Sequence, residues 1–230
     1  MNRFIALLFF IYLFTSACNN SDQNVVRFVS DDALFFDYQV WGDDEKNMVT
    51  VMLQFRSQDE NGKTLALKEP SKIELDGKML GMDSTKKSGP YYEYSTTVDS
   101  FAGKHSIQLT GITGKKYNEQ FEFRPIEIQN GWTDTVHRNG LTLQIGGLDK
   151  QDYLRIIALD TAFRSRGINE IDTVKDGQLT ISKELLKNLV NGPVRLEIYK
   201  EQQKPVQTGT SGGGNLLITY GLKRNFLLKD

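Results

Sequence analysis

Two histidines and one cysteine are the side chains of this 230-residue chain best suited to nucleophilic or metal chemistry. Nucleophilic catalysis needs a base within hydrogen-bond reach of a serine or cysteine, and a third group that orients the base. His105 falls in an alternating apolar segment, His137 falls in a connecting segment, and no Gly-x-Ser-x-Gly turn occurs. Because so few ligating side chains are available, we expect no enzyme activity, no metal and no cofactor.

Acidic residues gather at Asp31-Asp32 and at Asp43-Asp44-Glu45. Calcium takes about six to eight oxygen ligands, which loops at the end of a β-sandwich could provide. The chain has no Asp-x-Asp-x-Asp-Gly loop, however, and neighbouring acids commonly form a solvated turn. Two carboxylates at a fixed separation would suit a hydrolase of glycosidic bonds. The sequence does not indicate which acids pair, so a carboxylate-dependent hydrolase is the least favoured function.

A glycine-rich segment, Thr208-Gly209-Thr210-Ser211-Gly212-Gly213-Gly214-Asn215, precedes the last apolar segment. A phosphate-binding loop needs a lysine and a following helix, and this segment has neither. The composition instead predicts a mobile hairpin loop whose function, if it has one, is to contact a partner.

Trp41 and Trp132 are the residues best suited to glycan binding, because an exposed aromatic face can stack on a sugar ring. Trp41 ends an apolar strand that starts at Phe35, which also suits a place in the core or at its rim. Trp132 follows Asn130-Gly131 and is equally suited to packing the two halves of the chain together. Glycan stacking and structural packing therefore both stay open for these tryptophans.

Four tripeptides beginning with Asp and then Ser or Thr occur more often than random placement predicts. They are Asp134-Thr135-Val136, Asp160-Thr161-Ala162, Asp172-Thr173-Val174 and Asp83-Ser84-Thr85. They resemble the consensus at which Bacteroidota glycosylate exported proteins, which implies O-glycosylation at Thr135, Thr161, Thr173 and Ser84. The alternative is structural, because Asp-Thr is a natural pair at a turn. A glycan is too bulky for a core, so a modified residue must lie on exposed backbone.

Charge and composition limit the classes of partner. The 28 Lys and Arg residues are balanced by 29 Asp and Glu residues, which gives a net charge of −1. A nucleic-acid-binding domain needs a basic surface, so we expect no nucleic-acid partner. A hydrophobic share of 39% is enough for one large core or for two domains of about 100 residues each.

The first 17 residues are typical of a secretory signal peptide. Arg3 precedes an apolar run from Phe4 to Phe14, which is too short for a transmembrane helix of about 20 residues. Ser16-Ala17-Cys18 resembles the end of a bacterial lipobox, with Thr15 where that family usually has leucine. The resemblance implies that Cys18, the only cysteine, becomes the lipidated first residue of the mature chain.

Lipidation would make the membrane a partner of this protein. Each buried methylene of an acyl chain contributes about 0.8 kcal/mol, so several chains on Cys18 would anchor the protein firmly. Residues 18–24 then form a polar lipidated tether in which Asp22 is the only acid. We expect a lipid anchor at the outer membrane, with the periplasmic and the surface face both open.

Beyond the tether, apolar residues recur mostly at every second position, which predicts half-buried strands. Val49, Val51, Leu53 and Phe55 are an example, and Asp76-Gly77 and Asp176-Gly177 mark hairpin turns. Ser182 fits the N-cap of one short helix that Gly192-Pro193 follows. We therefore predict an all-β protein with two tandem Ig-like β-sandwich domains, residues 25–125 and 126–230, the second carrying the helix.

The mature chain resembles outer-membrane lipoproteins of Bacteroidota with tandem Ig-like domains. The stretches that carry the resemblance are Asp172–Ile181 and Ile218–Arg224. It implies the tandem architecture and the membrane anchor, and it implies no activity and no binding residues. The interpretation that follows is a lipid-anchored cell-envelope protein that acts by binding or assembly, as a component of an outer-membrane complex or an adhesion factor. The alternative is a surface glycan-binding lipoprotein.

Overall fold

A computed structural model of the chain describes residues 33–162 and 165–230. The leader (1–17), the lipidation site Cys18, the tether (18–24) and the acids Asp31-Asp32 lie outside the described residues. The described part is all-β, as the alternating pattern predicts, and its helices are two single turns, α2 (Val98–Phe101) and α3 (Lys183–Leu186). The predicted fold class is therefore confirmed.

Nine strands lie between residues 33 and 124, and we call this part the N-terminal half. They are β1 (Leu34–Asp43), β2 (Met48–Ser57), β3 (Thr64–Leu65), β4 (Lys72–Leu75), β5 (Lys78–Met79), β6 (Met82–Thr85), β7 (Gly89–Thr97), β8 (Gly103–Thr110) and β9 (Lys116–Phe123).

Eight strands follow Pro125 and form what we call the C-terminal half. They are β10 (Glu127–Ile128), β11 (Thr135–His137), β12 (Leu141–Gly146), β13 (Gln151–Asp160), β14 (Ile168–Lys175), β15 (Gln178–Ile181), β16 (Gly192–Pro205) and β17 (Gly214–Lys229).

The strands form two sheets. The larger sheet has 13 strands in the order β10-β12-β15-β14-β13-β16-β17-β1-β2-β7-β6, with β11 and β3 added beside β17 and β2. The smaller sheet has the order β5-β4-β8-β9. The two sheets face each other in the N-terminal half, where Phe36 of β1 meets Tyr117 of β9 edge to face, with ring centroids 5.4 Å apart. This half is therefore a two-layer β-sandwich.

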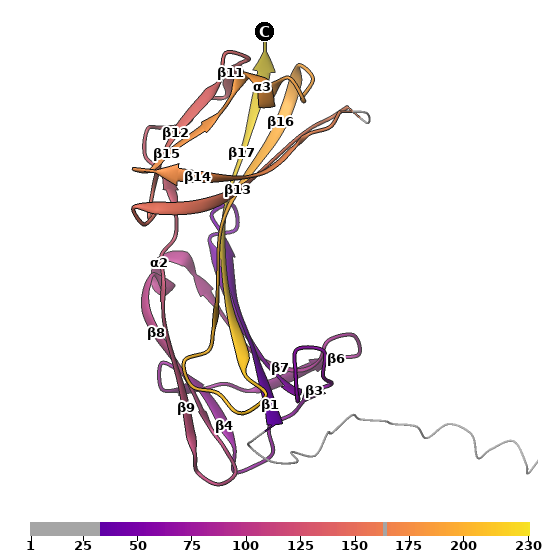
Figure 1. Cartoon of the computed structure of the whole chain (residues 1–230), viewed down its shortest axis with the longest axis vertical. Coiled ribbons are helices and arrows are strands. Elements are labelled where there is room, and N and C mark those ends of the chain that lie inside the picture. Colours follow the sequence, from indigo (N-terminus) through magenta and orange to yellow (C-terminus); the bar gives the residue numbers. More distant parts are fainter. Residues whose placement is uncertain (1–32, 163–164) are drawn as a thin grey trace, which may run out of the picture.

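The C-terminal hairpin of β16 and β17 runs through both halves (Figure 1). Residues 214–221 of β17 pair in parallel with β1, whereas residues 227–229 pair with β11. The even-numbered residues of β17 from Leu216 to Leu228 face the cores, and all of them except Arg224 are apolar. The last strand in the sequence thus completes the N-terminal sheet. The domain boundary expected at residues 125 and 126 stays a prediction, and this hairpin crosses it.

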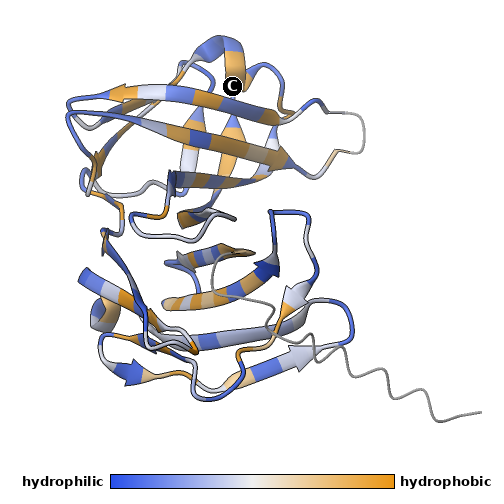
Figure 2. Cartoon of the chain, turned by 60° about the horizontal axis from the view of Figure 1, so that its bottom comes forward, coloured by the Kyte–Doolittle hydropathy of each residue, from blue (hydrophilic) through white to orange (hydrophobic). Residues whose placement is uncertain are grey.

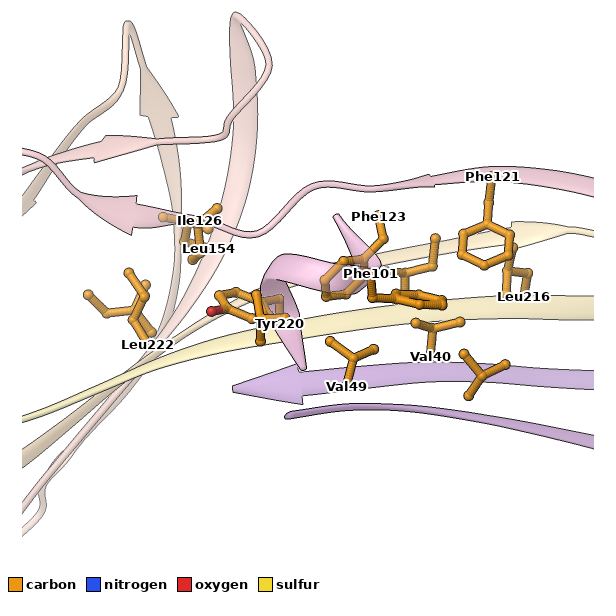
Figure 3. Packing of buried hydrophobic residues seen from close by; sticks show 14 of the residues in the cluster. Val40, Val49, Phe101, Phe121, Phe123, Ile126, Leu154, Leu216, Tyr220 and Leu222 are labelled. Carbon is orange, nitrogen blue, oxygen red and sulfur yellow. The ribbon is translucent and has the colours of Figure 1, made fainter. Parts of the chain in front are cut away.

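One continuous cluster of buried apolar side chains spans the two halves. Figure 3 shows Phe123, Tyr220 and Leu222 leading from one half into the other, and the rings of Phe123 and Tyr220 lie 5.7 Å apart. Hydrophobic residues alternate with polar ones along many of the strands in Figure 2, as expected for strands with one solvated face.

Local sequence signals account for several turns. The two Asp-Gly hairpins are confirmed, because Asp76, Gly77, Asp176 and Gly177 all have positive φ angles that suit tight turns between antiparallel strands. Ser182 is the N-cap of α3, and its side chain accepts a hydrogen bond from the Leu185 N–H at 3.3 Å. The expected short helix is α3, which is a single turn. The sequence does not predict α2, because the alternation of the preceding strand continues into Val98.

Candidate functional site

His105 has a structural role. Its Nδ1 lies 2.7 Å from Asp76 Oδ2, its Nε2 contacts the Phe101 carbonyl, and its ring stacks on Phe101 with centroids 3.8 Å apart. Because both ring nitrogens face oxygen atoms of the fold, neither can activate the neighbouring Ser106 hydroxyl. His105 therefore fastens the β4–β5 turn and α2 to β8. His137 lies elsewhere, with Nδ1 2.8 Å from the Asp230 carbonyl oxygen.

The acidic turn between β1 and β2 is neutralised by three basic residues of the C-terminal hairpin. Lys223 Nζ lies 3.0 Å from Asp43 Oδ2, and Arg195 lies 3.1 Å from Glu45. The third pair joins Arg224 to Asp44. These ion pairs link the two halves, so we interpret the acid cluster as a structural contact and not as a calcium site. Within residues 33–162 and 165–230, no group of three or more His, Cys, Asp or Glu side chains is placed to hold a metal ion.

Trp41 lies on the face of the large sheet that points away from the cores. It is 39% exposed, and its neighbours across the sheet are Thr50 on β2 and Thr219 on β17. Gln39, two residues earlier, and Asp43, two residues later, belong to the same face. Trp41 is thus an exposed aromatic residue with polar neighbours, and it has no place in the core.

Trp132 is fixed within the C-terminal half. Its indole N–H donates a hydrogen bond to the Asn225 carbonyl at 3.2 Å, and its ring packs against Phe226 at 6.0 Å. Both partners belong to β17, so Trp132 holds the segment before β11 against this strand. An indole used in this way is less available to stack on a sugar ring than Trp41 is.

The four residues in glycosylation-like tripeptides differ in exposure. Ser84 on β6 and Thr161 after β13 are exposed. Thr135 on β11 and Thr173 on β14 are half-buried. All four lie at the surface rather than in the core, so modification of each stays a prediction.

The glycine-rich loop before β17 is fastened to the N-terminal sandwich. Thr210 Oγ1 accepts a hydrogen bond from the Leu34 N–H at 3.0 Å, at the start of β1. A Cβ atom on Gly212 would lie 2.6 Å from the Leu34 carbonyl oxygen, so only glycine allows this approach. The loop therefore packs against the start of β1, whereas the sequence predicted a mobile loop that contacts a partner.

A buried carboxylate also holds the segment between β16 and β17 against the N-terminal sandwich. Glu119 on β9 is 2% exposed; its Oε2 accepts a hydrogen bond from the Gln207 N–H at 2.5 Å, and its Oε1 lies 2.9 Å from Lys204 Nζ. Burial, and then the Glu119 carboxylate, raise the pKa of the Tyr38 hydroxyl in the core. A charge buried in this way requires its partners, which ties the β16–β17 hairpin to β9.

A cavity of about 140 Å³ lies at the junction of the halves, and Tyr220 is one of the residues that line it. Arg124 at its rim pairs with Asp149 of the C-terminal half at 2.9 Å. Lys200 pairs with Asp152 at 2.8 Å. Because these cations are already paired, we assign the cavity to the joint between the halves and not to a ligand.

The outward side of the large sheet is continuous across both halves, and we call it the outer face. It carries a set of partly or largely exposed apolar side chains: Trp41, Met48, Met52, Tyr153, Ile157, Leu159, Ile171, Leu217 and Leu227. The most exposed of them lie on the β13–β14 pair, with Tyr153 at 58% and Ile171 at 62%. These two residues are diagonal neighbours, because Arg155 faces Ile171 across the pair.

Strand β14 also has an open edge. It pairs with β13 along its whole length, but it meets β15 at Lys175 and Gln178 alone. Residues 168–174 therefore have a strand partner on one side only, within the part of the chain that the structure describes. An open edge can accept a strand from another protein. Glu170 and Asp172 are exposed on it.

Sequence reasoning missed this surface. Tyr153 and Ile171 are ordinary strand residues by type, and they are exposed because they lie on the outward side of the β13–β14 pair, opposite Leu154 and Ile156. The alternation predicts which residues share a face, but not which edge of the sheet stays unpaired.

No family model matches the chain, and no curated protein matches it. A crystal structure of DIP-gamma IG1+IG2 is similar at 10% identity, with 84% of this chain and 99% of that chain covered and a TM-score of 0.25. A structure of a 1.5-MDa bacterial ice-binding adhesin, studied for host cell surface retention, is similar at 11% identity. The comparison covers 86% of this chain and 65% of that chain, with a TM-score of 0.24. Scores of this size define no shared fold, so the all-β architecture rests on the strand pairing of the chain itself.

None of the helices in the described ranges has the length and apolar character needed to cross a membrane.

Proposed function

We propose that this protein is a lipid-anchored component of the cell envelope that acts by binding a protein partner rather than by catalysis. The observation that carries the proposal is the β13–β14 pair, where Tyr153 and Ile171 are exposed beside an open strand edge. Exposed large apolar residues of this kind mark interaction sites. Assembly into an outer-membrane complex, or adhesion, would use this surface.

The charges of β14 favour a basic partner strand. Two copies of β14 paired antiparallel around Ile171 would place Glu170 opposite Asp172 of the other copy, and like charges opposite each other are destabilising. A strand with Lys or Arg at those positions would pair favourably with the same edge. The partner we propose is therefore a different protein with a basic strand, not a second copy of this chain.

Site-specific photo-crosslinking in the native host tests this proposal. A photo-reactive residue at position 171 should give one major adduct with an envelope protein. The matched control is position 79, because Met79 is 67% exposed but lies on the small sheet. The double variant Tyr153→Ser with Ile171→Ser should weaken partner capture at least about tenfold, whereas Met79→Ser should leave it unchanged. Equal adducts at positions 171 and 79, or full capture by the double variant, would contradict the assignment.

The lipid anchor is a separate part of the proposal and rests on the leader and Cys18. Cys18→Ala should abolish fatty-acid labelling and move the protein out of the membrane fraction. Membrane retention without labelling would show that another feature holds the protein at the membrane.

Glycan binding is a second candidate, favoured by one observation: Trp41 is exposed on the outer face with threonine neighbours on both sides. Glycan arrays, followed by titration of intrinsic fluorescence, test it. Trp41→Ala should abolish binding of a glycan that the protein recognises, and Trp132→Phe should retain it because that change keeps the contact with Phe226. An array without a hit would remove this candidate.

A further inference from the structure

A basic groove lies at the end of the N-terminal half where β1 begins. Its lining residues come from the β2–β3 turn and the β6–β7 turn: Arg56, Gly62, Lys63, Thr64, Lys86, Lys87, Ser88, Gly89 and Pro90. The two turns touch each other, because a Cβ atom on Gly89 would lie 2.0 Å from Thr64 Oγ1. The groove thus combines four cationic residues with the Thr64 and Ser88 hydroxyls, and its described lining residues include no carboxylate.

Three of the four cations have no ion-pair partner among residues 33–162 and 165–230. Arg56 pairs with Asp37 at 2.8 Å. Lys63, Lys86 and Lys87 are exposed, and no ion pair or side-chain hydrogen bond engages them among the described residues. Two acids, Asp59 and Glu60, precede Lys63 in the same turn, but they do not line the groove. Unpaired ammonium groups around hydroxyls are suited to a phosphate oxyanion.

The groove lies beside the point where the described chain enters the fold. The Gln58 N–H donates to the Ala33 carbonyl at 2.7 Å, and Leu34 lies opposite Ser57 in the sheet. Lys63 is held to the same place, because its carbonyl accepts a hydrogen bond from the Ser57 N–H at 3.0 Å. Leu34 follows Cys18 by 16 positions in the sequence, so Cys18 lies at most about 55 Å from this end of the fold.

We propose that this groove binds the phosphate groups of anionic lipids in the membrane that holds the lipid anchor. The inference rests on the proposed anchoring at Cys18, since the anchor brings this end of the fold to the surface. The electrostatic contact would orient the protein, with the groove toward the lipid and the C-terminal half away from it. The outer face and the β14 edge would then be presented to partners at a defined height above the membrane.

Vesicle binding by the unacylated protein tests the groove independently of the anchor. The mature chain, residues 18–230 with Cys18→Ser, should co-sediment with vesicles of phosphatidylglycerol and phosphatidylcholine but not with phosphatidylcholine alone. Binding should fall steeply with salt. A triple variant, Lys63→Gln with Lys86→Gln and Lys87→Gln, should lose on the order of 100-fold in partitioning, because each lysine near an anionic surface contributes about fivefold.

The matched control removes three exposed lysines elsewhere, by Lys150→Gln, Lys175→Gln and Lys187→Gln. It makes the same change in net charge and should bind vesicles like the unaltered chain. Equal losses of vesicle binding in both triple variants would contradict the assignment of lipid binding to the groove, because net charge alone would then explain the binding. No vesicle binding by the unaltered chain would overturn it as well, as would binding of inorganic phosphate in calorimetry without any vesicle binding. Fatty-acid labelling of Cys18 decides the anchor separately.

Discussion

The hydroxyl of Thr208 makes two hydrogen bonds with the backbone of Asn118: it accepts one from the N–H at 2.6 Å and donates one to the carbonyl at 2.7 Å. Asn118 lies on β9, the outermost strand of the small sheet, whereas Thr208 lies in the loop between β16 and β17. One side chain thus occupies a donor and an acceptor on a sheet edge that pairs with no further strand in the described part of the chain.

We expect Thr208→Val to lower the free energy of unfolding by about 1–2 kcal/mol, because two hydrogen bonds are lost while the shape is kept. Chemical denaturation monitored by fluorescence measures this change. Thr96→Val is the control, since Thr96 lies on β7 and its hydroxyl makes no hydrogen bond with any residue that the structure describes. Equal stability of the two variants would show that the loop contact contributes nothing.

The ion pairs of the acidic turn predict a loss of stability in acid. Burial alone would raise the pKa of Asp43, but the Lys46 N–H and the Lys223 ammonium together hold it below its usual value. A carboxyl with a lowered pKa in the folded state stabilises the protein above its unfolded pKa, and this stability is lost as the pH falls through the folded pKa. Unfolding free energy should therefore decrease as the pH falls below about 4.

Lys223→Gln should make this acid dependence shallower and cost about 1 kcal/mol at neutral pH. Lys72→Gln is the comparison, because the Lys72–Glu74 pair is more exposed and joins neighbouring residues of one strand. Urea titrations at several pH values measure both. A Lys223→Gln curve parallel to that of the unaltered chain would refute the role of the pair.

Tyr199 predicts a late step in an alkaline titration. Burial, and then its hydrogen bond to Glu197 at 2.6 Å, raise the pKa of Tyr199 to about 12. A raised pKa favours the neutral hydroxyl in the folded state, so the stability that it contributes is complete below about pH 10 and is lost between about pH 10 and 12. Tyrosinate absorbance should lose part of its latest component in Tyr199→Phe, and Glu197→Gln should shift that component to lower pH.

An absorbance curve of Glu197→Gln that coincides with that of the unaltered chain would contradict this prediction, because the hydrogen bond to Glu197 would then not perturb Tyr199.

Cleavage between the halves tests how strongly the C-terminal hairpin holds them. A protease site introduced at Gly131, where a Cβ atom would meet open space, should allow a single cut between Pro125 and Asn139. The two fragments should stay together in size-exclusion chromatography, because β17 pairs with β1 as well as with β11. Denaturant should separate them. Fragments that separated in native buffer would establish two independent domains.

How far the sequence predicts this fold depends on the range of the interactions. The turn at Asp76-Gly77 and the cap at Ser182 follow from neighbouring residues, so local patterns suffice for them. The contact of Thr208 with Asn118 spans 90 residues, and that of Lys223 with Asp43 spans 180. Nothing in the local pattern distinguishes Thr208 from any loop threonine. The open edge of β14 could not be predicted for the same reason, because it depends on the path that β15 takes.

The position of β17 has a consequence for how the protein matures. A chain that emerges from its N-terminus presents residues 34–123 early, yet the sheet to which they belong lacks residues 214–221 until nearly the whole chain is available. Pairing between such distant segments is slow, because the entropy cost of closing a long loop comes before any contact can offset it. Until β17 is available, the N-terminal half is therefore an incomplete sandwich in which one edge of β1 has no partner strand. During this interval the unpaired edge of β1 can pair with strands of other chains, so aggregation competes with the arrival of β17.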